Sequence, residues 1–235
     1  MSSTDWTDLT NSLSSVDVRR GVTGGATPPN GGGTFVYGMR SLAIVNGVVA
    51  RKTNQVNFDP TPSNKGGSIR GALQRGVSGG PAGFQPFLFI GAQGNDAAAD
   101  KAYMIGLTDG DPFKIVLVKG ALVNGIPDVA PGAQGVLRRS TASFAIGTWL
   151  HLRLDMRVNL TGDVVLSVFR NDLNANAVTS PVWAAVAGLE QIIDDTLGAN
   201  TGSLPFTEGR MGYGARFADV GRRVYFDHIE SIRET

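Results

Sequence analysis

The sequence predicts an all-β protein, built as a two-sheet antiparallel jelly-roll sandwich with at most one short helix near residues 188–197. Apolar and polar residues alternate strictly over residues 149–158, which is typical of a half-buried strand. Glycine occurs 32 times in 235 residues, and this many turn-forming residues favours many short elements. Only 4 of the 20 acidic residues are Glu, and the excess of Asp disfavours helices.

Residues 149–170 have the clearest pattern, and we interpret them as a β-hairpin with its turn at residues 159–163. Five apolar side chains of the first strand should face the core: Leu150, Leu152, Leu154, Met156 and Val158. Four polar side chains point to the opposite face: His151, Arg153, Asp155 and Arg157. We expect this polar face to contact solvent or a neighbour's surface, and we expect His151 to be exposed to solvent.

Further strands are expected on both sides of the hairpin. Residues 86–90 (PFLFI) form a dense apolar run, as in a central strand buried on both faces. Asn46-Gly47 interrupts the strand-like segment 42–51 and is a strong hairpin signal. The stretch 184–197 is the only plausible helix, beginning near Leu189. The other expected strands cover residues 35–42, 68–74, 102–107, 113–118, 136–144, 210–217 and 223–232.

The chain is predicted to divide into a polar N-terminal arm with a Gly/Pro-rich loop (1–34) and a single β-sandwich domain (35–235). Trp6, Leu9 and Leu13 suit a short helical turn, a first strand, or an arm that packs on a neighbour. The sequence leaves these three alternatives open. An arm of this kind would gain contact area if it became ordered on a neighbouring subunit.

Composition narrows the classes of partner. Charged residues make up 17% of the chain and the net charge is +1, which disfavours nucleic-acid binding through phosphate neutralisation. The sequence has no apolar run of about 18 residues, and its start, MSSTDW, lacks the features of a secretory signal. We therefore expect no nucleic-acid partner, no membrane partner, and synthesis in a cytoplasm without a signal peptide. The absence of Cys excludes disulfides, thiolate zinc sites and a Cys nucleophile.

Two pairs of segments resemble a known fold family. Residues 147–154 (GTWLHLRL) and 161–168 (TGDVVLSV) resemble a hairpin of concanavalin A-like lectin/glucanase and laminin-G-like domains. Residues 212–217 (GYGARF) and 224–229 (VYFDHI) are similar to the final strands of those domains. The resemblance implies two packed antiparallel sheets, one flat and one curved. It also implies a concave face or rim loops of the kind that often bind carbohydrate.

In composition the chain is also similar to virion proteins of tailed bacteriophages. It combines a polar N-terminus, few charges, no Cys, and loops rich in Gly, Asn and Thr. We therefore expect a non-enzymatic structural subunit of a phage particle: a head decoration, collar, tail or baseplate component. Its partners would be copies of itself and other virion proteins, and its location the virion after synthesis in the host cytoplasm. The alternative is a lectin-like, carbohydrate-binding module used for attachment to a host or a glycan.

No catalytic residues are expected. Retaining glycosidases need two carboxylates about 5 Å apart, and the glucanase branch of the family carries them in a pattern resembling E-x-D-x-x-E. Asp227 and Glu230 lack the first Glu of that pattern, and in a regular strand they would lie on opposite faces. The two histidines, His151 and His228, have no evident partners for a triad or a metal site.

Two candidate ligand sites remain. Asp109 and Asp111 bracket Gly110 in a turn and are the candidate calcium ligands, since calcium prefers clustered carboxylate and carbonyl oxygens. Ordinary turn chemistry is the favoured interpretation of these residues, so no cofactor is expected. Trp183 is the candidate for stacking on a sugar ring, although packing is its favoured role because large aromatic side chains dominate cores and interfaces.

Overall fold

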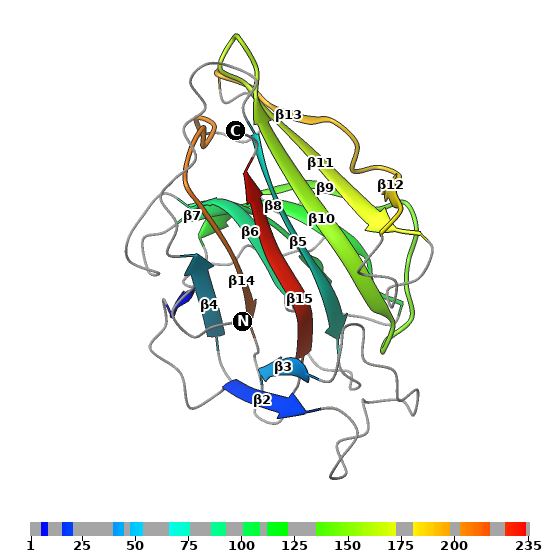
Figure 1. Ribbon diagram of the computed structural model, residues 1–235. Helices are drawn as coiled ribbons and strands as arrows, with labels where there is room; N and C mark the ends of the chain where they lie inside the picture. Colours follow the sequence, from blue (N-terminus) through cyan, green and yellow to red (C-terminus); the bar gives the residue numbers. More distant parts are fainter. Residues whose placement is uncertain are drawn as a thin grey trace.

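The protein forms two antiparallel β-sheets in a computed structural model (Figure 1). The described residues are 6–8, 16–20, 40–44, 48–53, 66–75, 86–92, 101–108, 112–121, 135–172, 181–197, 203–216 and 224–233. Sheet A contains, in spatial order, β1 (Trp6–Asp8), β4 (Val48–Thr53), β14 (Arg210–Arg216), β6 (Phe87–Ala92), β7 (Lys101–Leu107), β8 (Ile115–Ala121) and β9 (Val136–Arg139). Within these ranges, the all-β two-sheet prediction is confirmed.

Sheet B is built around long strands from distant parts of the chain. Its spatial order is β12 (Trp183–Ala185), β11 (Val164–Asn171), β10 (Trp149–Val158), β5 (Gly66–Arg75), β15 (Val224–Arg233), β3 (Arg40–Ile44) and β2 (Val16–Arg20), with β13 (Ile192–Asp194) also paired to β11. β5 pairs with β10 on one side and with β15 on the other. Figure 1 shows β15, β5, β10 and β11 side by side in one layer.

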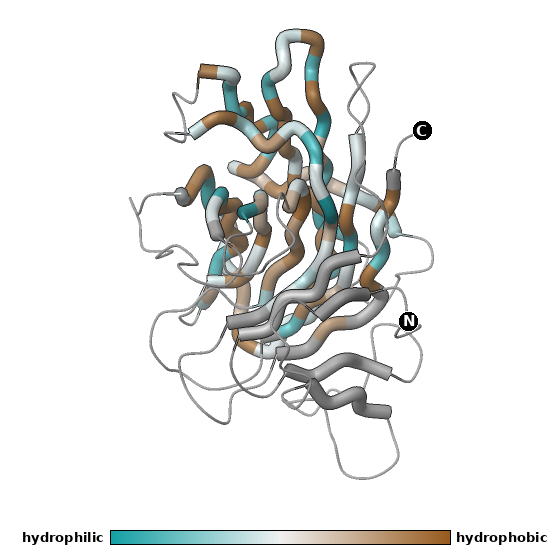
Figure 2. The backbone as a smooth tube through the Cα atoms, turned by 90° about the vertical axis from the view of Figure 1, so that its left-hand side faces the viewer, coloured by the Kyte–Doolittle hydropathy of each residue, from teal (hydrophilic) through white to brown (hydrophobic). Residues whose placement is uncertain are grey.

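The predicted hairpin at residues 149–170 is confirmed. β10 and β11 pair antiparallel, with Val158 opposite Val164 next to the turn. Gly162 has a φ of +87°, a left-handed conformation that glycine adopts without steric cost. All five apolar side chains assigned to the core face are buried. In Figure 2, hydrophilic and hydrophobic colours alternate along this hairpin, which reaches the top of the view.

The main core lies between the sheets. Ile69, Leu154 and Phe226 contribute from sheet B, and all three are fully buried. Leu88 and Tyr213 contribute from sheet A. The rings of Tyr213 and Phe226 connect the two layers, with centroids 5.2 Å apart. Contacts of this kind, between residues far apart in sequence, hold the two sheets together.

Sheet A is apolar on its second face as well. A separate buried cluster gathers there: Phe87, Phe89, Ala92, Ala102, Met104, Val116 and Val118. β6 is therefore buried at each of its six positions, with alternate side chains entering different clusters. The prediction that residues 86–90 form a central strand buried on both faces is confirmed.

The segment predicted as a short helix near residues 188–197 is not helical. It contains β13, which pairs with β11, while β12 lies just before it. Gly188 has a φ of +89° and Gln191 a φ of +47°, and an α-helix cannot continue through two left-handed residues. The buried Leu189 accepts a hydrogen bond from the amide of Val168, so the segment follows the sheet edge.

Within the described ranges, no helix is long and apolar enough to cross a membrane.

Two expectations for the first 53 residues have structural outcomes. The backbone of β1 pairs with β4, so Trp6 takes the strand alternative, whereas Leu9 and Leu13 lie outside the described residues. The backbone of β2 pairs with that of β3. The hairpin expected at Asn46-Gly47 is wrong, because β3 belongs to sheet B and the following β4 belongs to sheet A. The intervening residues 45–47 lie outside the described residues. The proposed boundary between residues 34 and 35 stays a prediction.

Candidate functional site

The outer face of sheet B, meaning the face turned away from the main core, carries charged and aromatic side chains. Because side chains alternate along strands, the core-facing residues identify the outward ones. The described outward side chains of the long strands and β12 are Ser68, Arg70, Ala72, Gln74, Trp149, His151, Arg153, Asp155, Arg157, Val165, Ser167, Phe169, Asn171, Trp183, Ala185, Glu230 and Ile232. This set differs from the second face of β6, β7 and β8 in sheet A, which is apolar and buried.

Strand register places two arginines side by side at the centre of this face. Arg153 of β10 is the register partner of Arg70 of β5, and Phe169 of β11 lies opposite Arg153 on its other side. Like charges directly opposite each other destabilise a sheet unless they are compensated. Each arginine is compensated by one carboxylate, Glu230 for Arg70 and Asp155 for Arg153.

The two ion pairs have different geometry. Glu230 Oε2 accepts hydrogen bonds from Arg70 Nε at 2.8 Å and from Nη2 at 2.5 Å. Asp155 Oδ2 accepts one hydrogen bond from Arg153 Nη2 at 2.7 Å. The carboxylate of Glu230 comes from β15, whereas that of Asp155 comes from two residues along β10 itself. Both pairs are partly exposed, so their guanidinium groups are oriented without being enclosed.

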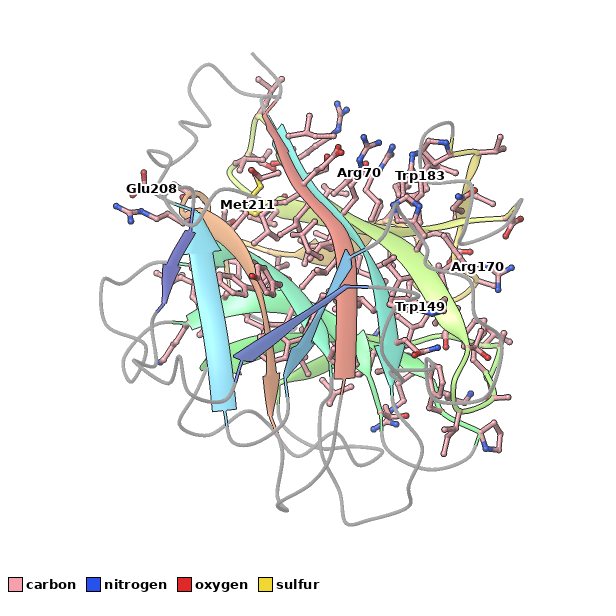
Figure 3. The ribbon with its side chains drawn as sticks, turned by 60° about the horizontal axis from the view of Figure 1, so that its bottom comes forward. Arg70, Trp149, Arg170, Trp183, Glu208 and Met211 are labelled. Carbon is pink, nitrogen blue, oxygen red and sulfur yellow. The ribbon has the colours of Figure 1, made fainter. Side chains whose placement is uncertain are left out.

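Aromatic rings surround the guanidinium group of Arg153. Its Cζ lies 4.5 Å from the centroid of the Phe169 ring and 5.3 Å from that of Trp183. Contacts of this kind attract a cation to the negative face of the ring. Trp183 is itself half-buried. Figure 3 shows Arg70 and Trp183 on the same side of sheet B.

His151 differs from its prediction. Solvent exposure was expected, but the side chain is fully buried. Its ring packs against Trp183, with centroids 4.8 Å apart, and Nδ1 lies 3.4 Å from Asn171 Nδ2. The cause is tertiary, because β12 pairs with the end of β11 and brings Trp183 over this position. The buried ring of His151 therefore forms part of the surface on which Trp183 packs.

Burial of the outer face of β10 increases from Arg157 to His151. Arg157 is exposed, Asp155 and Arg153 are partly buried, and His151 is enclosed. The expectation of a uniformly solvent-facing or neighbour-facing surface is therefore wrong for His151. Trp183 belongs to this surface, and it combines packing against His151 and Arg153 with partial exposure.

A β-bulge changes the placement expected for Asp227 and Glu230. Asp227 pairs with Ala72 and Glu230 pairs with Arg70, so three steps along β15 match two steps along β5. An extra residue of this kind alters the alternation of a strand. The two acidic residues therefore stand opposite positions on the same face of β5, contrary to the regular-strand expectation. The side chains of Asp227 and His228 lie outside the described part of the structure.

The candidate calcium ligands Asp109 and Asp111 also lie outside the described residues. β7 and β8, which flank this turn, do pair antiparallel, with Leu107 opposite Ile115. No group of three or more His, Cys, Asp or Glu residues within the described ranges could hold a metal ion. Calcium binding therefore stays a prediction of the sequence.

A buried ionic cluster between the sheets was missed by sequence reasoning. Lys119 Nζ lies 2.6 Å from Asp194 Oδ2, and both side chains are almost completely buried. Tyr103 donates a hydrogen bond to the same carboxylate oxygen. Burial, followed by the contact with Asp194, raises the pKa of Tyr103 far above its ordinary value. The available signal was the position of Lys119, two residues after the core residue Leu117 in an alternating strand.

The cluster fastens a loop to the edge of the sandwich. Lys119 Nζ also donates hydrogen bonds to the carbonyl oxygens of Ser203 and Leu204, at 2.9 and 2.8 Å. The hydroxyl of Tyr103 accepts a hydrogen bond from the amide of Phe206. The ammonium group thus has three oxygen partners, as a buried charge requires. This arrangement is suited to stability, since its polar groups are occupied by one another.

A cavity of about 430 Å³ lies between β9 and the segment 188–193. Its lining includes Arg138, Glu190 and Gln191, together with aliphatic side chains, and it contains no aromatic ring. Glu190 accepts a hydrogen bond from the amide of Gly188. The outer face of sheet B therefore offers the better combination of flat apolar surface and hydrogen-bond donors.

Comparisons with known proteins concern the fold. No protein-family model matches the chain, and no curated protein matches it in sequence. A solved structure of an engineered GH43 glycoside hydrolase, with endo-xylanase and exo-arabinofuranosidase activity, is 13% identical with a TM-score of 0.51. That match covers 98% of this chain and 38% of the hydrolase chain, so this protein corresponds to just over a third of the hydrolase.

Two further solved structures cover nearly the whole chain. The carbohydrate-binding module CBM66 from Bacillus subtilis is 10% identical, covers 97% of this chain and 96% of its own, and has a TM-score of 0.48. A lectin from Bauhinia forficata in complex with GalNAc is 10% identical, covers 98% of each chain, and has a TM-score of 0.46. These likenesses concern the two-sheet fold alone, and none of these findings concerns a phage particle.

Proposed function

We propose that this protein is a non-catalytic, lectin-like carbohydrate-binding domain whose ligand lies on the outer face of sheet B. The observation that carries the proposal is the grouping of Phe169, Arg153 and Trp183 on that face. Sugar-binding surfaces combine aromatic rings, which cover the apolar faces of sugar rings, with a few polar groups that orient the ligand. Both kinds of group are present here, because the rings of Phe169 and Trp183 both contact the guanidinium group of Arg153.

The rigidity of the supporting strands favours binding. Arg70 and Arg153 project from β5 and β10, which are each paired on both sides within sheet B. Ion pairs with Glu230 and Asp155 further restrict both arginines. A surface that is ordered before binding loses less conformational entropy when a ligand arrives. The proposal rests on this surface, because a shared fold alone does not determine function.

A glycan array followed by calorimetry on the purified full-length protein tests this proposal. Trp183→Ala and Phe169→Ala should each weaken binding to any glycan found by at least about tenfold, because each removes a ring surface. Leu160→Ala is the matched control, since Leu160 is 80% exposed at the hairpin turn, away from the aromatic group. Absence of binding across the array, with and without calcium, would contradict the proposal.

Assembly into a phage particle is a second proposal. It is supported by the cysteine-free composition and the low charge. Exposed apolar side chains provide an additional observation, because Leu160 and Leu197 are 80% and 87% exposed. The turns that carry them are connected, since Asp163 accepts a hydrogen bond from the amide of Thr196. Exposed apolar groups close together mark contact surfaces.

Particle assembly has a direct test. Mass spectrometry of purified particles should detect the chain, and light scattering should show self-association that Leu160→Ser with Leu197→Ser reduces. A chain that is absent from particles and monomeric at high concentration would overturn this second proposal. A virion subunit that also binds a glycan would satisfy both proposals.

The non-enzymatic part of the proposal is tested by polysaccharide turnover. Glu230 is held in a two-point contact by Arg70, which is suited to a structural or ligand-orienting role. We expect no hydrolysis of polysaccharides by the full chain. Turnover that Glu230→Ala or Asp227→Ala abolishes would replace the lectin-like proposal with a glycan hydrolase.

A further inference from the structure

We infer that the ligand of the outer face of sheet B is a carboxylated saccharide, a uronate-containing glycan, whose carboxylate is bound between Arg70 and Arg153. This inference rests on the proposed carbohydrate-binding function and names its ligand class. It depends on three features of the described residues: the register of the two arginines, the directions from which their carboxylate partners come, and the aromatic rings beside one of them.

The register places the two arginines next to each other on the outer face of sheet B. Arg70 and Arg153 are directly opposite each other on neighbouring antiparallel strands. Cβ atoms in such pairs lie about 4.5–5.5 Å apart. The two long side chains start from the same face, so their ends can contact the two oxygens of one carboxylate. An anion between them would add to the compensation that Glu230 and Asp155 already give.

The partner carboxylates leave donor groups available. Glu230 accepts from Nε and Nη2 of Arg70, so Nη1 lies outside that contact. Asp155 accepts from Nη2 of Arg153, so Nη1 of this side chain is likewise outside the contact. β15 lies on the side of β5 opposite to β10, and Asp155 lies along β10. Neither carboxylate therefore comes from between the two arginine-bearing positions.

The charge of the face also favours an anion. Its described charged side chains are Arg70, Arg153 and Arg157 against Asp155 and Glu230, three positive groups and two negative. Arginine forks match the planar, two-oxygen geometry of a carboxylate.

The aromatic groups explain why the anion belongs to a sugar. Phe169 and Trp183 contact the guanidinium group of Arg153 and are both half-buried, so flat apolar surface lies directly beside the anion position. A uronate presents a carboxylate and a ring with an apolar face in a fixed relation. A simple inorganic anion would use the arginines and leave the rings without a ligand.

Calorimetry with matched glycans tests the inference. The probes are uronate oligosaccharides prepared from polygalacturonate and from alginate, and the same oligosaccharides after chemical reduction of their carboxyl groups. Each pair has the same chain length and linkages but differs in charge. We expect the acidic form of at least one pair to bind at least about tenfold more tightly than its neutral form, because charge-assisted hydrogen bonds are lost on reduction.

Variants identify the residues responsible. Arg70→Gln and Arg153→Gln should each reduce the preference for the acidic form, and the double variant should remove it. Arg70→Lys keeps the charge without the fork, and we expect an intermediate preference. Arg138→Gln is the control, because Arg138 is an exposed arginine on β9 of sheet A. Thermal unfolding of each variant checks that the fold is intact.

The outcomes separate the inference from the proposed function. Equal binding of acidic and neutral forms, or binding of neutral array glycans alone, would overturn the inference and leave the lectin-like function standing. Binding of sulfated glycans without binding of uronates would also overturn it. Absence of binding to every glycan would remove both. A preference for uronates that persists in the double arginine variant would assign the anion site elsewhere.

Discussion

The two sheets of this protein differ in how they use their second face. The central strands of sheet A, β6, β7 and β8, are buried on both sides and contribute apolar side chains to two separate clusters. Sheet B is buried on one side, and its other side presents arginine, carboxylate and aromatic groups. Sheet A therefore acts as a scaffold, while sheet B provides a rigid surface on which a ligand can be recognised.

Removing a ring from each sheet gives the largest contrast. Phe89 is fully buried in the second cluster of sheet A, and Phe89→Ala should cost about 4 kcal/mol of unfolding free energy because it leaves a cavity. Phe169→Ala on the outer face of sheet B should cost about 1 kcal/mol, because this ring is half-exposed. Urea denaturation measures both values, and equal costs would contradict the scaffold-and-surface distinction.

Removing a charge should show the same distinction. Asp194→Asn leaves Lys119 buried without its counter-ion and should cost about 3 kcal/mol. The double replacement Lys119→Met with Asp194→Leu should recover much of this loss, because it removes the uncompensated charge.

The matched control for the buried pair is Asp172→Asn. Asp172 holds an exposed ion pair with Arg170, and its loss should cost about 0.5 kcal/mol or less. Chemical denaturation of all four proteins at one pH gives the comparison. A similar cost for Asp194→Asn and Asp172→Asn would show that the buried cluster does not stabilise the sandwich as described.

Glycine replacements separate backbone packing from side-chain packing. Gly209 has a φ of +137°, and an added Cβ would lie 2.4 Å from the backbone carbon of Gly91. Gly209→Ala should cost about 2 kcal/mol, since neither the strained conformation nor the backbone contact can relax easily. At Gly67 of sheet B, the added Cβ meets the flexible end of Met211, so Gly67→Ala should cost less. The order of the two melting temperatures checks this prediction.

The smallest expected effect is a pH dependence at the β10–β11 turn. Hydrogen bonds from Thr161, Thr196 and Asn159 lower the pKa of Asp163 from 3.8 to about 2. A lowered folded-state pKa contributes stability above pH 4 that is lost as the pH falls through about 2. Unfolding free energies between pH 2 and 5 should therefore decline less steeply for Asp163→Asn than for the unchanged protein. Parallel pH profiles would count against this role of the turn.

Local patterns allowed part of the candidate site to be predicted. Alternation along residues 149–158 assigned Arg153 and Asp155 to the outer face, because side-chain direction in a strand follows sequence spacing. Trp183 was named as a sugar-stacking candidate, and it lies on this face. Arg70 could not be predicted as a site residue. Its importance comes from standing opposite Arg153, which lies over 80 residues away in the chain.

The sequence by itself determined the all-β class, the hairpin and the doubly buried strand at residues 86–90, since each depends on side chains a few residues apart. Tertiary structure alone decided the burial of His151, the bulge before Glu230, and the strand in place of the predicted helix near residues 188–197. It also decided the meeting of Lys119 with Asp194. Each of these depends on which distant strands pair and in what register, and that choice is made by the packing of the whole sandwich rather than by any local pattern.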